Sequence, residues 1–249
     1  MKRHLAALLL AGTALATPAL ALDLTSMSEA ERAAFRDEVR AYLLENPEVI
    51  MEAVAVLEER QAASQVAQDA ELVKANAPDL FADENSWVGG NPEGDVTMVE
   101  FIDYRCGYCR RAHDEVAQLI NSDGDIRFII KEFPILGEAS LISSQFAIAT
   151  RLVEGDAAYK QVADALIKLK ADPEKSVLQA MADSLGLDGP AIIAKMDSGQ
   201  VNDIIAENRA LGQRLNISGT PTFVMDDMVL RGYMPLAQMQ DITAQLRAE

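Results

Sequence analysis

The chain has 249 residues, of which 39 are acidic and 22 basic, so its formal net charge at pH 7 is −17. Such an acidic surface repels phosphate backbones, and no basic stripe or aromatic-studded basic cluster offsets it, which excludes a nucleic-acid-binding protein. The length allows one sizeable core with an appendage.

The first 21 residues have the pattern of a secretory signal peptide. Positively charged residues 2–4 precede an apolar stretch over 5–15, and Ala19-Leu20-Ala21 gives the small-x-small pattern that signal peptidase needs. The apolar stretch is shorter than the roughly 20 residues of a membrane span. We expect cleavage after Ala21 and export to a compartment where disulfides form, with an uncleaved anchor as the alternative.

Residues 22–80 predict two amphipathic helices without a core of their own. A capping-box pattern at Ser28–Glu31 begins the first helix, and Asn46-Pro47 separates it from the second. Because two such helices cannot bury both apolar faces against each other, they must pack on the main domain or on another protomer. We expect self-association, so residues 22–80 are a predicted oligomerisation segment; a solvated helical linker is the alternative. The apolar positions are Phe35, Val39, Tyr42 and Leu43, then Ile50, Val54 and Leu57.

From about residue 85 the pattern is that of an α/β fold. The predicted order is β-α-β, then a block of helices, then β-β-α. This order indicates an α/β sheet with an all-helical insertion. The expected elements are an edge segment at 86–92, a strand at 96–102, a helix at 106–120, a strand at 125–133, helices over about 138–213, hairpin strands at 222–225 and 228–231, and a helix from Pro235.

Cys106-Gly107-Tyr108-Cys109 contains the only two cysteines of the chain. The motif lies where a strand gives way to a helix, so Cys106 meets the outward-pointing N–H groups of the first helical turn. Such settings lower the pKa of a cysteine and make it nucleophilic. Cys109, about one turn further on, is placed to resolve a mixed disulfide. The motif predicts thiol–disulfide exchange, with Cys106 and Cys109 as catalytic residues and no cofactor.

Metal binding is the competing use of two cysteines at this spacing. A structural zinc site needs four ligands, and too few cysteines and histidines are available after processing. Copper(I) needs only two thiolates and accepts thioethers, so a copper-handling protein remains a second hypothesis. The methionines late in the chain are more often core filler: Met225, Met228, Met234 and Met239.

Glu100 is the most informative ionisable residue near the motif. An acid inside an apolar strand should be at least half buried and should have a raised pKa. We predict that Glu100 relays a proton for Cys109, with Lys131 as a charge partner; a solvent-facing strand residue is the alternative. His113 lies two turns from Cys106, too far for a catalytic base, so a structural or surface role is expected. Arg105, Arg110 and Arg111 add positive charge nearby.

The stretch 99–109, together with Gly219-Thr220-Pro221-Thr222-Phe223, resembles the DsbA-like branch of the thioredoxin superfamily. The resemblance covers about residues 85–249 and implies a thioredoxin-like fold with a helical insertion. It implies that Glu100 is the buried acid before the active site. It also implies that Thr220-Pro221 is the cis-proline loop, which binds substrate beside Cys106 together with Gly107 and Tyr108.

The direction of exchange rests on two elements of the motif. Gly107-Tyr108 with Thr220 before the proline is similar to the disulfide isomerase DsbC, whereas strong oxidases of the family carry Pro-His and a valine. The helical extension resembles ScsC and Com1-type proteins. We therefore expect a periplasmic isomerase, with a monomeric oxidase as the alternative. The implied partners are exported cysteine-containing clients and a membrane redox partner of the DsbB or DsbD/ScsB type.

Overall fold

The structure, a computed structural model, describes residues 26–248. The expected signal peptide and its cleavage site at Ala21 lie outside these residues. The chain divides into two compact units, the first ending at Glu59 and the second beginning at Arg60. Within residues 26–248, every helix is too short or too polar to cross a membrane.

The first unit contains helix α1 (Glu29–Glu45) and the start of helix α2 (Glu48–Ala75). The predicted capping box is present, since the Ser28 N–H donates to Glu31 Oε2 at 2.8 Å and the Glu31 N–H donates to Ser28 Oγ at 3.4 Å. No residue from 26 to 59 is buried. The exposed apolar side chains here are Phe35, Val39, Tyr42, Leu44, Ile50, Met51, Val54, Val56 and Leu57.

The end of α2 and helix α3 (Ala77–Phe81) belong to the second unit, which differs from the expected boundary near residue 80. Val73 and Leu80 are buried in the second unit's core. The Arg231 guanidinium also donates to both carboxylate oxygens of Asp69, at 2.6 and 2.8 Å. These few contacts are widely spaced in a polar stretch, so helical periodicity does not reveal them.

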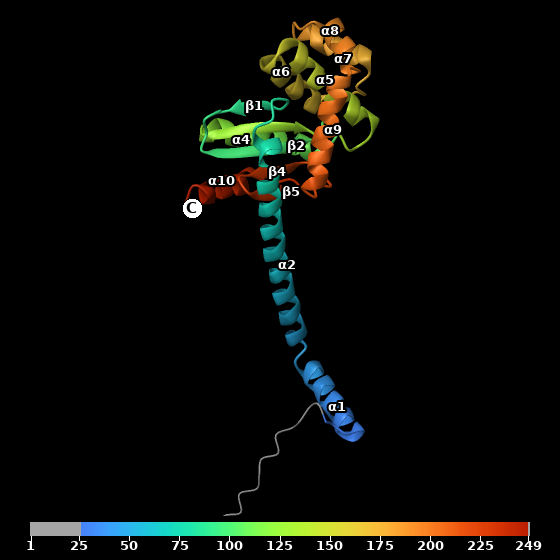
Figure 1. Ribbon diagram of the computed structural model, residues 1–249, viewed down its shortest axis with the longest axis vertical. Coiled ribbons are helices and arrows are strands. Elements are labelled where there is room, and N and C mark those ends of the chain that lie inside the picture. The colour runs from blue at the N-terminus through green and yellow to red at the C-terminus, as the bar shows by residue number, and fades with distance from the viewer. Residues whose placement is uncertain (1–25, 249) are drawn as a thin grey trace, which may run out of the picture. The chain divides into compact units, whose positions relative to one another are not determined.

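A five-stranded mixed sheet forms the centre of the second unit (Figure 1). β2 runs parallel to β3, and the other three neighbouring pairs are antiparallel. The strand order is β1-β3-β2-β4-β5, so β2 has neighbours on both sides. The strands are β1 (Trp87–Gly90), β2 (Val96–Ile102), β3 (Ile126–Glu132), β4 (Thr222–Met225) and β5 (Met228–Arg231).

Successive side chains of β2 point to opposite faces of the sheet, so the strand contributes to two hydrophobic cores, one on each face. Met98 and Ile102 belong to the larger core, which includes residues of α4 (Gly107–Asp123) and α10 (Leu236–Leu246). Val99 and Phe101 belong to the smaller core, with Leu80 and side chains from the end of α9. The two-sided burial explains why β2 is almost continuously apolar.

Five helices between β3 and β4 form the predicted insertion. Figure 1 shows α5 to α8 gathered together, with α9 leading from them back to the sheet. Trp87 connects the insertion to β1, because its ring stacks on Tyr159 and its Nε1 donates to the Asp156 carbonyl at 3.0 Å. The helices are α5 (Glu138–Glu154), α6 (Asp156–Lys168), α7 (Lys175–Ser184), α8 (Gly189–Met196) and α9 (Gly199–Arg214).

Candidate active site

Cys106 and Cys109 lie at the N-terminus of α4, directly after β2. Cys106 is the cap residue of α4, with extended backbone angles, and its N–H donates to the Asp103 carbonyl at 3.0 Å. Both cysteines are present as unpaired thiols and both are buried, Cys109 completely. The strand therefore delivers Cys106 to the start of the helix and places Cys109 inside the first turn.

Asp103 fixes the turn between β2 and α4. One carboxylate oxygen accepts the Arg105 N–H at 2.8 Å, and the other accepts the N–H groups of Ile135 and Leu136 at 2.9 and 3.1 Å. This buried carboxylate thus joins the cysteine turn to the loop that follows β3.

The expected positive side chains hold the site in place. Arg105 donates to the Ala171 carbonyl at 3.0 Å, and Arg110 donates to the carbonyls of Leu169 and Tyr104 at 2.9 and 3.1 Å. These bonds fasten the cysteine turn to the chain just after α6. The guanidiniums of Arg105 and Arg110 donate to backbone carbonyls, so the role that the structure gives these two side chains is to hold the turn in place.

The Thr220–Pro221 peptide bond is cis, as the resemblance implies, and it lies beside Cys106. In its thiol form Cys106 donates to the Thr220 carbonyl at 3.1 Å. While Cys106 is a thiol, the Thr220 hydroxyl is buried and has no hydrogen-bond partner within residues 26–248. Thr220 thus brings a carbonyl to the Cys106 thiol and a hydroxyl that stabilises the Cys106 thiolate.

The two cysteines have pKa values displaced in opposite directions. Hydrogen bonds from the Cys109 thiol, the Thr220 side chain and the N–H groups of Cys109 and Tyr108 lower the pKa of Cys106 to about 5, against the effect of burial. The thiolate of Cys106, burial and the nearby Glu100 raise the pKa of Cys109. The site therefore holds one thiolate and one protonated thiol at neutral pH.

Glu100 is only 3% exposed, and burial, Glu132 and Cys106 raise its pKa to about 8. The expected burial and raised pKa are thus confirmed, and the solvent-facing alternative is wrong. Its Oε1 has no hydrogen-bond partner within residues 26–248. The charge of Glu100 is in turn one cause of the raised pKa of Cys109.

Lys131 does not serve as the charge partner of Glu100, so that expectation was wrong. Lys131 pairs with Phe101 in the parallel register and extends to the face opposite Glu100, because residues one apart point to opposite sides of a sheet. There its ammonium contacts the Asp83 carboxylate and donates to the Asp79 carbonyl at 2.6 Å. The register of β3 against β2 determines that Lys131 faces away from Glu100, and the sequence alone does not give that register.

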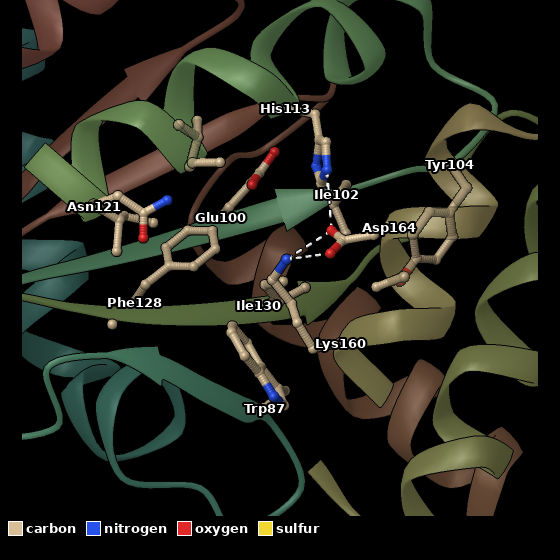
Figure 2. A pocket seen from close by; sticks show the side chains of 15 residues that line it. Trp87, Glu100, Ile102, Tyr104, His113, Asn121, Phe128, Ile130, Lys160 and Asp164 are labelled. Atoms are coloured by element: carbon tan, nitrogen blue, oxygen red, sulfur yellow. Dashed lines mark hydrogen bonds and ion pairs between the residues drawn. The ribbon is translucent and has the colours of Figure 1, made fainter. Parts of the chain in front are cut away.

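A cavity of about 290 Å³ lies between the sheet, α4 and α6, and Glu100 contributes to its wall. Figure 2 shows the labelled side chains around it, with Trp87, Phe128 and Ile130 on the apolar side. His113 Nε2 lies 3.0 Å from Asp164 Oδ1, and Lys160 also pairs with Asp164. His113 therefore joins α4 to α6, the structural role expected for it.

Tyr108 presents the largest exposed aromatic surface at the site, at 61%. The Tyr108 and Tyr233 rings are stacked, with 6.5 Å between their centroids. The Arg111 guanidinium lies 4.2 Å from the centre of the Tyr233 ring. Gly107 leaves open space beside it. The surface next to Cys106 is thus aromatic and accessible, with the Arg111 guanidinium beside it.

The late methionines pack mainly in the core. Met225, Met234 and Met239 are buried in the larger core, as core filler would be. The described part of the chain contains no cluster of three or more His, Cys, Asp or Glu side chains arranged for a metal ion.

Sequence reasoning missed Glu132. This buried acid ends β3, and its Oε1 accepts the hydroxyls of Tyr104 and Tyr159, each at 2.6 Å. Two charged residues in succession, Lys131 and Glu132, at the end of an apolar strand were a usable signal. Only their placement on opposite faces of the sheet shows that Glu132 shares a face with Glu100.

Comparison with known proteins supports this architecture. The thioredoxin family profile matches residues 82–244, and the profile described as the copper resistance protein ScsC N-terminal domain matches residues 31–64. Disulfide bond formation protein D of Bacillus subtilis is 23% identical over 164 residues, covering 61% of this chain and 72% of that protein. The chain also matches Na⁺/H⁺ antiporters of Herminiimonas arsenicoxydans and two Salinispora species, but spans only 21–23% of their length.

Solved structures give the same result. A thioredoxin-like oxidoreductase from Silicibacter pomeroyi is 38% identical with a TM-score of 0.64, and the match covers 69% of this chain and 98% of that one. BcfH of Salmonella enterica Typhimurium is 26% identical with a TM-score of 0.72, covering 87% and 96%. The chain therefore belongs to the thioredoxin superfamily, among the thiol–disulfide oxidoreductases of the DsbA and ScsC type.

Proposed function

We propose that the protein is a periplasmic disulfide isomerase that acts through Cys106 and Cys109. The Cys106 thiolate attacks a client disulfide, which forms a mixed disulfide and releases one client thiolate. The client's own thiols then displace Cys106, or Cys109 displaces the client and closes the Cys106–Cys109 disulfide. Electrons pass through the sulfurs, so the reaction needs no cofactor.

The opposed pKa directions of the two cysteines carry this proposal. A pKa of about 5 keeps Cys106 ionised and a good leaving group at neutral pH. Cys109, held protonated by its surroundings, resolves the mixed disulfide only after losing its proton. Glu100 is the proposed acceptor of that proton, because its charge acts on Cys109 and it has no competing partner at Oε1 in the described chain.

Clients are proposed to bind across Tyr108 and the cis-Pro221 loop. The Thr220 carbonyl lies 3.1 Å from Cys106 Sγ, so a peptide whose sulfur joins Cys106 passes next to this backbone. Tyr108 and Gly107 supply an exposed, uncharged surface that suits unfolded clients of varied sequence.

Cysteine variants test the assignment of roles. We expect Cys106→Ala to abolish exchange, and Cys109→Ala to accumulate mixed disulfides with scrambled, disulfide-containing clients, visible on non-reducing gels. Iodoacetamide alkylation of Cys106 should follow a titration with a midpoint near the pKa of about 5. Activity retained by Cys106→Ala would show that the site is elsewhere.

The direction of exchange is tested by reactivation of scrambled ribonuclease in a glutathione buffer, using residues 22–249. Gly107-Tyr108 and Thr220 lead us to expect efficient reactivation. Rapid oxidation of reduced ribonuclease without reactivation of the scrambled form would make the protein a DsbA-like oxidase.

We propose that residues 22–80 are an oligomerisation segment. The exposed apolar side chains of its first unit, such as Phe35, Tyr42 and Leu57, fit a surface covered by another copy of the chain. Sedimentation of residues 22–249 should show an oligomer, and deletion of residues 22–59 should give a monomer that oxidises thiols but reactivates scrambled ribonuclease poorly. A monomeric full-length protein would contradict this role.

A copper(I)-handling protein is the second candidate, favoured by the match of residues 31–64 to a domain named for copper resistance. Cys106 and Cys109 would be its ligands. Anaerobic copper(I) titration decides between the candidates, since affinity no greater than that of a simple dithiol eliminates this one.

Two partners complete the proposed cycle. With only two cysteines in the chain, oxidising or reducing equivalents must come from another protein. We propose a membrane redox partner of the DsbB or DsbD/ScsB type, and exported cysteine-containing clients.

A further inference from the structure

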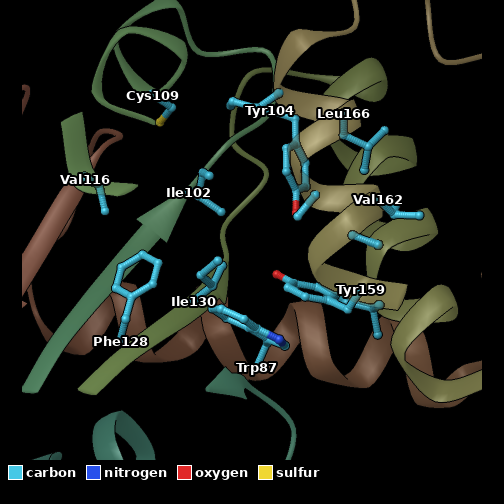
Figure 3. Close-up of a cluster of buried hydrophobic side chains, with 14 of the residues drawn as sticks. Trp87, Ile102, Tyr104, Cys109, Val116, Phe128, Ile130, Tyr159, Val162 and Leu166 are labelled. Atoms are coloured by element: carbon cyan, nitrogen blue, oxygen red, sulfur yellow. The ribbon is translucent and has the colours of Figure 1, made fainter. Parts of the chain in front are cut away.

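Glu132 is a buried acid that the proposed reaction does not use. It is 3% exposed, and both short hydrogen bonds from Tyr104 and Tyr159 end on the same oxygen, Oε1. Figure 3 shows the hydroxyls of Tyr104 and Tyr159 turned toward a common point. Buried hydrogen bonds to a carboxylate are strong, so this group is rigidly held.

The partners of Glu132 come from three separate parts of the second unit. Tyr104 lies in the turn that leads to Cys106, and Tyr159 belongs to α6. The backbone carbonyl of Glu132 accepts the Asn208 side chain of α9 at 3.1 Å. One residue at the end of β3 thereby joins the cysteine turn to the helical insertion.

Glu132 also shares a sheet face with Glu100. In the parallel register Glu100 lies beside Ile130, and Ile102 lies beside Glu132. Residues 130 and 132 point to the same side of β3, so the two acids are diagonal neighbours, about 7–8 Å apart at the backbone. The polar groups that face Glu132 from the surrounding elements are Tyr104, Tyr159, Ser144, Asp103 and Glu100.

Two buried acids at this distance affect each other. Burial raises the pKa of Glu132 to about 7, although the tyrosine hydroxyls favour its carboxylate. The charge of Glu132 is in turn one reason why Glu100 holds its proton. The charge of Glu132 therefore changes near neutral pH, where Glu100 is proposed to act.

We propose that Glu132 is a positioning residue of the thiol site. It holds Tyr104 in the cysteine turn, and its charge acts on Glu100 on the neighbouring strand. This inference rests on the proton relay in the proposed function. Its consequence is that Glu132 controls the resolution of the mixed disulfide by Cys109, and leaves the attack by Cys106 unchanged.

A stopped-flow reaction of the reduced protein with dithiobis-nitrobenzoate separates these two steps. The Cys106 thiolate first cleaves the reagent, releasing one coloured thiolate and leaving the other half on Cys106. Cys109 then gives its proton to Glu100 and displaces the second coloured thiolate, forming the Cys106–Cys109 disulfide. The pH dependence of each phase is measured for each variant.

Glu132→Gln keeps an oxygen that accepts both tyrosine hydroxyls but removes the charge. We expect the pH midpoint of the second phase to fall by about one unit, the size expected for two charges at this separation in a protein interior. The first phase should not move, since Glu132 is not among the causes of the lowered pKa of Cys106. Asp114→Asn, which removes an exposed charge from α4, is the matched control and should shift neither phase.

Tyr159→Phe keeps the test decisive even if Glu132→Gln does not fold. Losing one hydrogen bond to the carboxylate raises the pKa of Glu132, so less of its charge remains and the second midpoint should fall by a smaller amount. An unmoved or raised second midpoint in a folded Glu132→Gln or Tyr159→Phe variant, or equal shifts of both phases, overturns the inference.

Glu100→Gln separates this inference from the proposed function. If it leaves the rate and pH dependence of the second phase unchanged, the relay itself is wrong. If it removes that pH dependence while Glu132→Gln leaves the midpoint in place, the relay stands and only the role of Glu132 is wrong.

Discussion

Each face of the central sheet buries an ionisable side chain, and the surroundings of the two side chains differ. Lys131 is 1% exposed, yet its ammonium contacts Asp83 and the Asp79 carbonyl from the segment around α3. Glu100 is equally buried on the other face, next to a cavity, and its Oε1 has no partner in the described chain. A buried charge that has a partner stays ionised, whereas a buried acid without one keeps its proton, and raised pKa values of this kind cluster at functional sites.

The largest expected effect is on the pH dependence of stability, through Glu100→Gln. With a pKa of about 8 in the folded chain, Glu100 keeps its proton between roughly pH 4 and 8 while the unfolded chain loses it. Native stability therefore falls as pH rises through this window. Glu100→Gln should remove that fall, a relative gain on the order of 3–5 kcal/mol at pH 9 compared with pH 4.

Urea unfolding across this pH range measures the effect, with exposed Glu138→Gln as the control. Parallel stability curves for Glu100→Gln and the unchanged protein would mean that Glu100 is not held neutral, and the contrast between the two faces would disappear.

The next largest effect is expected from Asp83→Asn. Removing one partner of a buried ion pair leaves the charge of Lys131 without its carboxylate, which costs about 3 kcal/mol. The pKa of Lys131, already lowered by burial, falls further, so the variant should gain stability as pH rises toward 10. Thermal unfolding at neutral pH and at about pH 9.5, which is below the pKa of an unfolded lysine, checks both statements; a loss that does not shrink at the higher pH contradicts them.

The smallest effect is expected from Asp79→Asn. Its carboxylate pairs with Arg214 at 2.5 Å on the surface, where an ion pair contributes under about 1 kcal/mol. Its backbone carbonyl, not its carboxylate, accepts the hydrogen bond from Lys131, and the substitution leaves that bond intact. A destabilisation as large as that of Asp83→Asn would show that the charge around Lys131 is shared among several carboxylates.

Local patterns predict most of this fold. The strand at 96–102, the hairpin strands and the breaks between the inserted helices are where periodicity, Gly and Pro indicate them, because each signal lies within a few residues. The cysteine turn and its cis-proline were likewise predictable from short motifs. Packing of the end of α2 on the sheet was not, since it depends on isolated residues such as Val73 and Leu80.

The candidate site divides in the same way. Glu100 could be found because an acid interrupts an apolar strand. The partners of Lys131 and the role of Glu132 depend on the register of β2 with β3 and on contacts more than 20 residues away along the chain. No local pattern contains that information, so only the assembled sheet separates a structural charge from a functional one.

Trp87 is the only tryptophan of the chain, and it stacks on Tyr159 while its ring edge meets Phe128. It also lines the cavity that Glu100 shares. The indole therefore stands between the cysteine-bearing sheet and the inserted helices, where its fluorescence emission responds to the water and charge around the buried acids. We therefore expect the fluorescence of Trp87 to follow the charge of the buried acids without any added label.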